Sequence, residues 1–469
     1  MKVLLLFIAA SLNCAAWFDT VITVRDIMFF LPLFSIIISV IALIPQVTRG
    51  RIEFKIVYFA VFGMIYFNAP LYFTAIFDPN ELSLLLRSLR ISELSFIKAN
   101  FLFGISLPLI CAGYLMFEIR SISRITYTRL QNKRKLQIKP YTIGLFVFLI
   151  LSLGVTGLEV GSTYIGTSSY YYIILTRLAL ISVAIVLYNG LGPSAKIDNF
   201  KSILLRNKIT SLGILLFVTY VLIGGDRGPA LTAISMLMFG YILLNRMSVK
   251  IRDFFLGGIL LLVISTLFSF VEILRTFEGE VDLEILAIAV AASQDAENTA
   301  GVMIRTTSLA VDGISTGLYD HTYGLFIIQS VLKGIPFVGD FVAGTLTDTA
   351  SPLTNGSAHL LTLQYSGTGY TSGIGTTFLA DTYIEFGVVG IVIISLIYGI
   401  IAAKFHNNCK NLTLSNFSLF LLILLFVGYS FYTGRGTFWA FLPHFIHTWI
   451  FYMLIKILAQ PTKFLLNEK

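Results

Sequence analysis

Residues 209–244 read ITSLGILLFVTYVLIGGDRGPALTAISMLMFGYILL. Two apolar runs, 209–224 and 229–245, are separated only by glycines, Asp226 and Arg227. Each run approaches the roughly 20 residues that a helix needs to cross the hydrocarbon of a bilayer. Inside a bilayer the backbone must satisfy its own polar groups, which favours helices. The segment therefore predicts two transmembrane helices joined by a tight turn at the membrane surface.

Similar apolar runs recur along the whole chain. Hydrophobic residues make up 56% of the 469 residues and charged residues only 12%, a balance that excludes a soluble domain built around one core. The runs predict an all-α, polytopic integral membrane protein with about twelve transmembrane helices. The expected spans are 3–18, 27–47, 56–77, 101–119, 141–157, 171–189, 209–224, 229–245, 254–273, 384–403, 416–432 and 439–459.

Basic residues orient these predicted helices. With the N-terminus in the cytoplasm, the basic loops share the cytoplasmic side, as the positive-inside rule requires. These loops are 48–55, 120–139, 196–208 and 246–252. The pattern predicts a multi-pass protein with both termini in the cytoplasm, and it explains the net charge of +8 without a nucleic-acid partner. The segment 3–18 also fits a cleaved signal peptide, because Lys2 precedes a short apolar run that ends in small residues.

One connection is much longer than the others and covers residues 275–383. Loops of this length in compact proteins are usually functional or disordered. The apolar stretches LEILAIAVAA and YGLFIIQSVL favour a folded extracytoplasmic cap with about two or three short helices. The chain then divides into nine transmembrane helices (1–274), the large loop (275–383), and three further helices with a cytoplasmic tail (384–469).

Four arginines, Arg177, Arg227, Arg275 and Arg435, lie at the predicted outer ends of transmembrane helices. Arginine near the bilayer centre costs roughly 2.5 to 3.5 kcal/mol on insertion scales, and its planar guanidinium can hold phosphate oxygens in a bidentate fork. Any one of them could instead reach lipid headgroups or pair with an acid such as Asp226. Together, against the positive-inside bias, they predict a cationic site for a lipid-borne diphosphate at the outer leaflet.

A reaction at such a site also needs a group that accepts a proton. Glu385, His321 and Asp226 are the candidates, and the sequence ranks them equally. Glu385 equally fits a cap at the start of its own helix, because acids favour helix N-termini. His444 and His447 lie one turn apart in the last predicted helix. No further ligand completes a metal site there, so we expect neither a metal nor another cofactor.

Several local patterns resemble the Wzy-type oligosaccharide repeat-unit polymerases, integral membrane enzymes that extend O-antigen and related bacterial surface polysaccharides. They are the arginine of YYIILTRLALI, the turn LIGGDRGPAL, the arginine of EILRTFEG, and the stretches HTYGLFIIQSVLKGIP and DTYIEFGVVGIVIISLIYGI. The resemblance covers residues 175–438, whereas residues 1–150 are similar only in hydropathy. It implies a GT-C-like membrane glycosyltransferase of the bacterial cytoplasmic (inner) membrane.

The resemblance also implies a reaction. The protein would transfer a growing glycan from undecaprenyl diphosphate to a new undecaprenyl-diphosphate-linked repeat unit at the periplasmic face, without a metal. The four arginines would bind the leaving diphosphate. The loop tyrosines would stack on the sugars: Tyr319, Tyr323, Tyr365 and Tyr370. A flippase and a chain-length regulator would be partners within the lipid bilayer.

Two alternative functions stay open. An O-antigen ligase, which passes a finished chain to a different acceptor, would show the same helices, loop and arginines. A non-enzymatic flippase or transporter of lipid-linked oligosaccharides belongs to another class. Transporters usually carry broken helices and repeat symmetry around a site at the membrane midplane, and neither is evident in this sequence.

Overall fold

The computed structural model describes most of the chain, in several stretches. The described residues are 2–18, 25–43, 51–53, 86–87, 90–118, 138–156, 170–190, 200–223, 227–244, 248–250, 301–335, 356–366, 375–410, 417–432, 439 and 441–458. These residues are almost entirely helical, as the sequence predicts.

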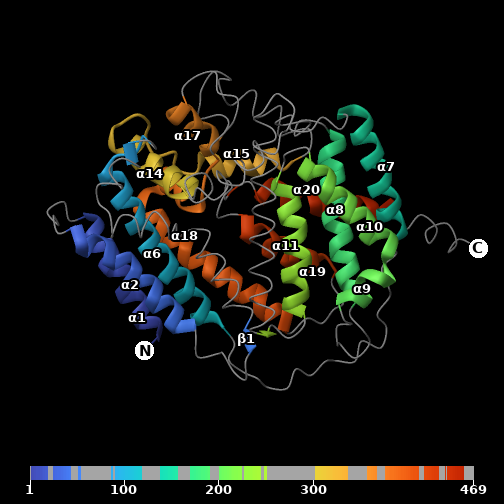
Figure 1. The fold of residues 1–469 in the computed structure, drawn as a ribbon, viewed down its shortest axis with the longest axis horizontal. Coiled ribbons are helices and arrows are strands. Elements are labelled where there is room, and N and C mark those ends of the chain that lie inside the picture. Colours follow the sequence, from blue (N-terminus) through green and yellow to red (C-terminus); the bar gives the residue numbers. More distant parts are fainter. Residues whose placement is uncertain are drawn as a thin grey trace, which may run out of the picture.

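The helices form two groups, each with its own buried apolar core (Figure 1). The first group consists of α1 (Lys2–Phe18), α2 (Arg25–Leu43), α6 (Glu93–Phe117) and α18 (Phe378–Lys410). The second consists of α7 (Lys139–Thr156), α8 (Tyr170–Asn189), α9 (Phe200–Arg206), α10 (Lys208–Ile223), α11 (Arg227–Leu244), α19 (Phe417–Tyr432) and α20 (Phe441–Leu458). Contacts of α18 with α11 and α19 join the two groups.

Three helices are long and apolar enough to cross a membrane: Glu93–Phe117, Tyr171–Asn189 and Phe378–Phe405. A fourth span results if α9 and α10, whose axes are bent by 100°, count together. The chain is therefore a multi-pass helical membrane protein. The count of about twelve spans stays a prediction, and its segments 56–77 and 254–273 lie outside the described residues.

A short β-ribbon was not predicted from the sequence, nor was helix α9, which lies within the predicted loop 196–208. Strand β1 (Arg51–Glu53) pairs antiparallel with β2 (Ser248–Lys250). The ribbon joins two of the loops that their basic residues assign to one side of the membrane. Near the same end of the molecule, the Asn407 side chain of α18 donates to the Phe117 carbonyl of α6 at 2.7 Å.

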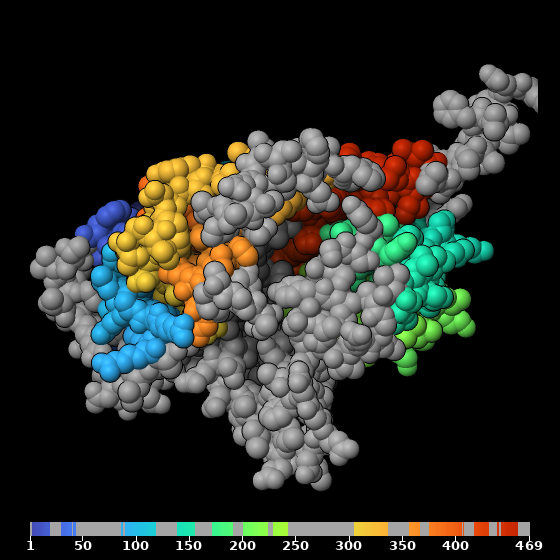
Figure 2. All heavy atoms as spheres, turned by 90° about the horizontal axis from the view of Figure 1, so that it is seen from above, coloured from blue at the N-terminus to red at the C-terminus, as the bar shows by residue number. Residues whose placement is uncertain are grey.

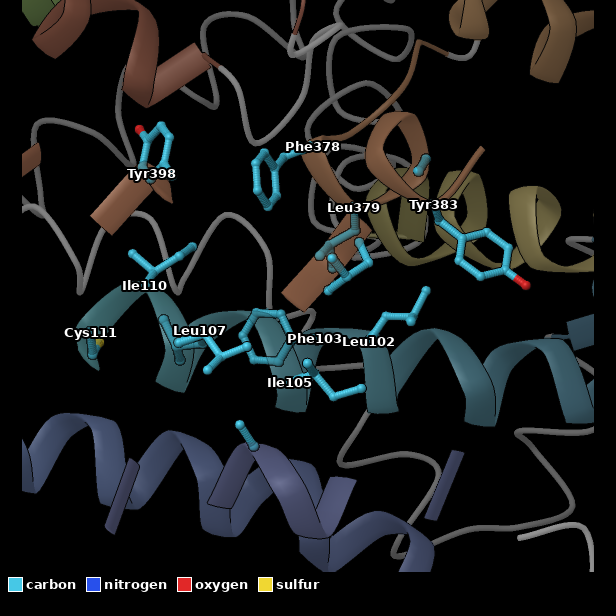
Figure 3. Packing of buried hydrophobic residues seen from close by; sticks show 14 of the residues in the cluster. Leu102, Phe103, Ile105, Leu107, Ile110, Cys111, Phe378, Leu379, Tyr383 and Tyr398 are labelled. Atoms are coloured by element: carbon cyan, nitrogen blue, oxygen red, sulfur yellow. The ribbon is translucent and has the colours of Figure 1, made fainter. Parts of the chain in front are cut away.

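The core of the first group depends on close contact between α6 and α18. Figure 3 shows side chains of both helices, among them Leu102, Phe103 and Phe378, filling the space between them. Farther along, a Cβ atom at Gly399 would lie 2.1 Å from the Ile110 carbonyl oxygen. A Cβ atom at Gly113 would lie 2.4 Å from the Leu396 carbonyl oxygen. Small residues that let backbones touch are the usual means of helix association in membranes.

The close contact between α6 and α18 predicts the effect of adding one methyl group at Gly399. Gly399→Ala should destabilise the protein by about 1 to 3 kcal/mol, because the new Cβ atom must push the two backbones apart. Gly154→Ala is the matched control, since nothing lies within 4 Å of a Cβ atom there. Thermal unfolding in detergent checks the pair: the midpoint should fall for Gly399→Ala and not for Gly154→Ala. Equal midpoints would contradict this account of the α6–α18 interface.

Three short helices lie in the described part of the long 275–383 segment: α14 (Gly301–Ser315), α15 (Leu325–Lys333) and α17 (Ser357–Ser366). We call them the loop helices. They lie on one face of the molecule, at the end opposite to the β-ribbon (Figure 1), and Figure 2 shows that face with the described residues 301–335 and 356–366 in yellow and orange. Helix α14 contacts α6, α17 and α18, and α15 contacts α20. The loop helices therefore touch both helix groups. The division of the chain at residues 275 and 383 stays a prediction.

Candidate functional site

The loop-side end of α18 carries two buried carboxylates and a break in the helix. Asp381 and Glu385 lie one turn apart, and both side chains are 0% exposed. Two residues later, Gly387 adopts φ 64° and ψ −155°, which interrupts the helical path. A positive φ of this kind is readily accessible only to glycine. Helix α18 begins at Phe378, six residues before the predicted span, so both carboxylates belong to its first turns.

Glu385 caps a different helix from its own. Its Oε2 atom accepts hydrogen bonds from the Thr322 hydroxyl at 3.0 Å and from the Gly324 amide, and its Oε1 atom accepts from the Ile327 amide at 3.1 Å. The first amides of α15 have no partner within the helix, and Gly324 has no side chain to supply one. A carboxylate at a helix N-terminus is also favoured by the helix dipole. Glu385 therefore fixes the start of α15 onto α18.

Asp381 does the same for α17. Its Oδ1 atom accepts from the hydroxyl of Ser357, the first residue of α17, and from the Thr376 hydroxyl at 2.7 Å. Two buried carboxylates on neighbouring turns of one helix thus hold two of the loop helices. Removing either carboxylate would leave buried donors without an acceptor, which costs about 1 to 3 kcal/mol for each group.

Glu385→Gln provides a direct test of this arrangement. The side-chain amide keeps one acceptor but turns a donor toward one of the backbone amides of α15, so we expect the start of α15 to loosen. Hydrogen exchange read by mass spectrometry should show faster exchange at the amides of Gly324 and Ile327. Glu93→Gln, the same change at an exposed residue of α6, is the control. Unchanged protection of both amides would contradict the capping role.

His321 packs against this same junction. Its Nδ1 atom lies 3.2 Å from the Ile384 carbonyl oxygen. A carbonyl only accepts, so Nδ1 carries a proton, and in the neutral ring Nε2 holds the lone pair. The ring meets Tyr383 edge-on, with centroids 5.6 Å apart. Among the described residues no hydrogen-bond partner is found for Nε2, and the missing side chain of Gly387 leaves room beside it.

Two backbone hydrogen bonds fix the segment that follows His321. The Thr322 amide donates to the Ile384 carbonyl at 3.1 Å, and the Tyr323 amide donates to the Glu385 carbonyl at 2.9 Å. Tyr323 has a left-handed φ of 48° and a side chain that is 76% exposed. A non-glycine residue in this conformation is uncommon and often lies at a functional site. The structure thus presents an aromatic ring beside an imidazole with a free lone pair.

A second polar cluster lies in the other helix group. Arg177 of α8 is only 3% exposed. Its Nη1 atom donates to the Tyr429 hydroxyl of α19 at 3.4 Å, and its Nη2 atom donates to His444 Nδ1 of α20. The rings of Tyr429 and His444 stack on each other, with centroids 5.1 Å apart. The Nε atom of Arg177 is buried without a hydrogen-bond partner. No carboxylate among the described residues contacts this guanidinium.

Helix packing brings the predicted diphosphate-binding segments to the same end of the molecule. A Cβ atom at Gly428, next to Tyr429, would lie 3.0 Å from the Thr232 carbonyl oxygen of α11. Arg227, the first residue of α11, lies five residues before Thr232, or about 7.5 Å along a helix. Arg435 lies in the connection between the ends of α19 and α20. Arg177 and Arg227 therefore belong to helices α8 and α11, which pack against each other and against α19, whereas Arg435 itself lies outside the described residues.

Comparison with known proteins decides the family. The family model of the O-antigen polysaccharide polymerase Wzy matches residues 2–463, nearly the whole chain. The protein belongs to the Wzy family. A search of curated proteins and a search of solved structures each found no match. Membership of the Wzy family confirms the family that the local sequence patterns resemble, and with it a role in the polymerisation of a surface polysaccharide.

The predicted site residues of this Wzy protein fall into two clusters and an undescribed remainder. His321 and Glu385 lie together, and Arg177 lies in the other helix group, without a hydrogen bond to either among the described residues. Helix α15 connects the two clusters. Glu385 caps its N-terminal end, and Gly334 at its C-terminal end packs against Ile446 of α20, two residues after His444. Asp226, Arg275, Arg435 and the side chain of Arg227 lie outside the described residues.

The loop tyrosines have different surroundings. The Tyr319 hydroxyl donates to Gln364 Oε1 at 3.0 Å, and burial together with the negative charge of Asp312 raises the pKa of this tyrosine. The Tyr319 hydroxyl is thus engaged within the loop helices, whereas the side chain of Tyr323 is mostly exposed. Tyr370 lies outside the described residues.

Sequence reasoning on this Wzy protein missed the partners of Arg177. From the sequence, His444 was considered only together with His447, as an incomplete metal site. In the structure the His444 ring accepts a hydrogen bond from Arg177. The available signal was the depth of the polar residues. Arg177, Tyr429 and His444 each lie near the end of an apolar run that faces the predicted outer side.

Proposed function

We propose that this Wzy protein joins two undecaprenyl-diphosphate-linked glycans at the periplasmic face of the bacterial inner membrane. The growing chain is transferred from its carrier to the nonreducing sugar of one new repeat unit. Family membership over residues 2–463 carries the proposal. The basic loops predict that both termini are cytoplasmic, and with that orientation the loop helices would lie on the periplasmic side.

Arg177 is proposed to bind the leaving diphosphate. A buried cation without a counter-ion costs several kcal/mol, and such residues in membrane proteins persist where they serve a ligand or an ion. Among the described residues, Arg177 pairs only with the neutral hydroxyl of Tyr429 and a ring nitrogen of His444. Arg227 is the first residue of α11, and Arg435 follows α19 in the sequence; both helices have an end near Arg177. Arg275 is proposed to join these arginines. A diphosphate would neutralise this group of guanidinium ions.

The chemistry is a substitution at the anomeric carbon of the growing chain. The acceptor hydroxyl oxygen forms the new C–O bond, the bond from the anomeric carbon to the diphosphate breaks, and undecaprenyl diphosphate leaves with the electron pair. Negative charge grows on the leaving group, so fixed guanidinium ions stabilise the transition state more than the ground state. This accounts for the reaction without a metal.

His321 is proposed to accept the proton of the attacking hydroxyl. Among the described residues nothing hydrogen-bonds to its Nε2 atom, which in the neutral ring holds a lone pair, whereas both oxygens of Glu385 already accept hydrogen bonds at the start of α15. We therefore rank His321 above Glu385 as the base, and Asp226 stays a candidate.

Gene deletion in the source bacterium tests the proposed reaction. Surface glycan is separated by length on a gel, with and without the wild-type gene restored. A polymerase predicts that the deletion leaves single repeat units on the normal acceptor and that the restored gene returns the ladder. Long lipid-linked chains that never reach the acceptor would identify a ligase instead. Repeat units retained on the cytoplasmic side would identify a flippase.

A further inference from the structure

A second group of cations lies on the loop helices, apart from Arg177. Arg305 of α14 lies over the ring of Tyr365 of α17, with its Cζ atom 4.6 Å from the ring centre. Arg90, just before α6, lies over the same ring at 5.6 Å. Two guanidinium groups from distant parts of the chain thus share one aromatic ring. Each contact is a cation–π interaction, but the two like charges repel each other.

Neither guanidinium has an acidic partner in the described part of the chain. The nearest carboxylate along α14, Asp312, accepts hydrogen bonds from the hydroxyls of Ser92 and Ser95 at 3.3 and 3.1 Å. The Nε atom of Arg305 is buried and has no hydrogen-bond partner. Arg90 donates one hydrogen bond, from Nη1 to the Tyr365 carbonyl, at 2.9 Å. A guanidinium carries five N–H donors, so most of the donors of this pair stay available.

Holding α14 and α17 together does not require these arginines. The Tyr319 hydroxyl donates to Gln364 Oε1 at 3.0 Å, and Gln364 Nε2 donates to the Leu309 carbonyl at 3.0 Å. These bonds already connect the two helices.

The left-handed φ of Arg90, 54°, belongs to a helix C-terminal cap, in which the Ile91 amide donates to the Leu86 carbonyl at 2.9 Å and the Arg90 amide donates to the Arg87 carbonyl at 3.1 Å. This cap fixes the backbone of Arg90 beside Tyr365. Two like charges on one ring, without an acidic partner among the described residues, point to an anionic ligand.

We propose that Arg90, Arg305 and Tyr365 form an oxyanion-binding subsite for the glycan, separate from the Arg177 cluster. Arginine pairs bind carboxylate and phosphate through paired hydrogen bonds, and a tyrosine ring beside them offers a face for a sugar. The bound group is either the carboxylate of an acidic sugar or the diphosphate of the second lipid-linked substrate. That the ligand is a glycan rests on the proposed function, whereas the anion site itself does not.

Arginine-selective labelling measures this site without any need for polymerase activity. The full-length protein in detergent is treated with phenylglyoxal, and the rate of labelling at each arginine is read by peptide mass spectrometry. Three probes are added in turn: methyl β-glucuronide, inorganic pyrophosphate and neutral methyl β-glucoside. Arg87 is exposed and lies three residues from Arg90, so it is the internal control. A ligand at about ten times its Kd should slow the labelling of Arg90 about tenfold.

The probes distinguish the two sources of the anion. Protection of Arg90 by the glucuronide identifies an acidic sugar, and protection by pyrophosphate alone identifies the diphosphate; neutral glucoside should have no effect in either case. Arg305→Gln should abolish the protection, Arg305→Lys should keep part of it, and Arg177→Met should leave it unchanged. The proposal is overturned if neither anion protects Arg90, if Arg87 is protected equally, or if Arg305→Gln gives the wild-type result. These outcomes do not depend on whether the protein is a polymerase.

Discussion

Arg177→Met should slow glycan polymerisation about 100- to 1,000-fold, the usual cost of removing one fixed donor that stabilises a developing anion. The reason is that Arg177 places a buried guanidinium, without a carboxylate partner among the described residues, at the end of the second helix group. The measurement is the initial rate of chain growth by the purified protein in detergent.

Stability separates this role from a structural one. Methionine removes the two hydrogen bonds to Tyr429 and His444, worth about 1 kcal/mol each. It also removes a buried charge whose desolvation costs several kcal/mol. Arg177→Met should therefore unfold at a temperature no lower than that of the wild type. Arg177→Lys, which keeps the charge but not the fork, should be intermediate in rate. A much lower unfolding temperature would mean that Arg177 serves the fold.

His321→Gln should reduce the rate about 100- to 10,000-fold, the range that a positioned general base contributes. Glutamine can still donate a hydrogen bond to the Ile384 carbonyl, so the junction with α18 should survive. His321→Phe is the complementary variant, because it keeps an aromatic ring against Tyr383 and lacks the base. Both variants should be similarly slow.

The pH dependence of the rate distinguishes a base from a packing residue. General-base catalysis by His321 predicts a pH dependence of the wild-type rate that both variants lack. If both variants are slow but keep the wild-type pH profile, His321 acts through packing. If Asp226→Asn alone removes the pH dependence, the base is Asp226.

Apolar periodicity and charge predicted the coarse architecture well, because both depend on short stretches of chain. The helix around Arg177 was expected to within one residue, and the helix around Glu385 was expected at 384–403 but is longer at both ends. The pairing of β1 with β2 was not, since two three-residue strands far apart in sequence have no local signal. The same pairing nevertheless agrees with the assignment of loops 48–55 and 246–252 to one side.

The roles of single polar residues were harder to predict, because they depend on which helices become neighbours. Glu385 was expected to act as a base or to cap its own helix. It caps α15, a contact across 58 to 63 residues of sequence. Arg177 was expected at an anion site, but its hydrogen bonds to Tyr429 and His444 span more than 250 residues. The break at Gly387 depends on its backbone angles, and the presence of a glycine in the sequence does not determine those angles.

The central claim is that this protein forms glycosidic bonds by releasing undecaprenyl diphosphate beside Arg177. It is tested most directly by reconstituting the purified protein in liposomes with a single lipid-linked repeat unit as the only substrate. The measurement counts the undecaprenyl diphosphate released and the glycosidic bonds formed. We predict equal numbers of the two for the wild type, and release at least about 100-fold slower for well-folded Arg177→Met. Release at the wild-type rate in that variant, or no release by the folded wild type, would contradict the account.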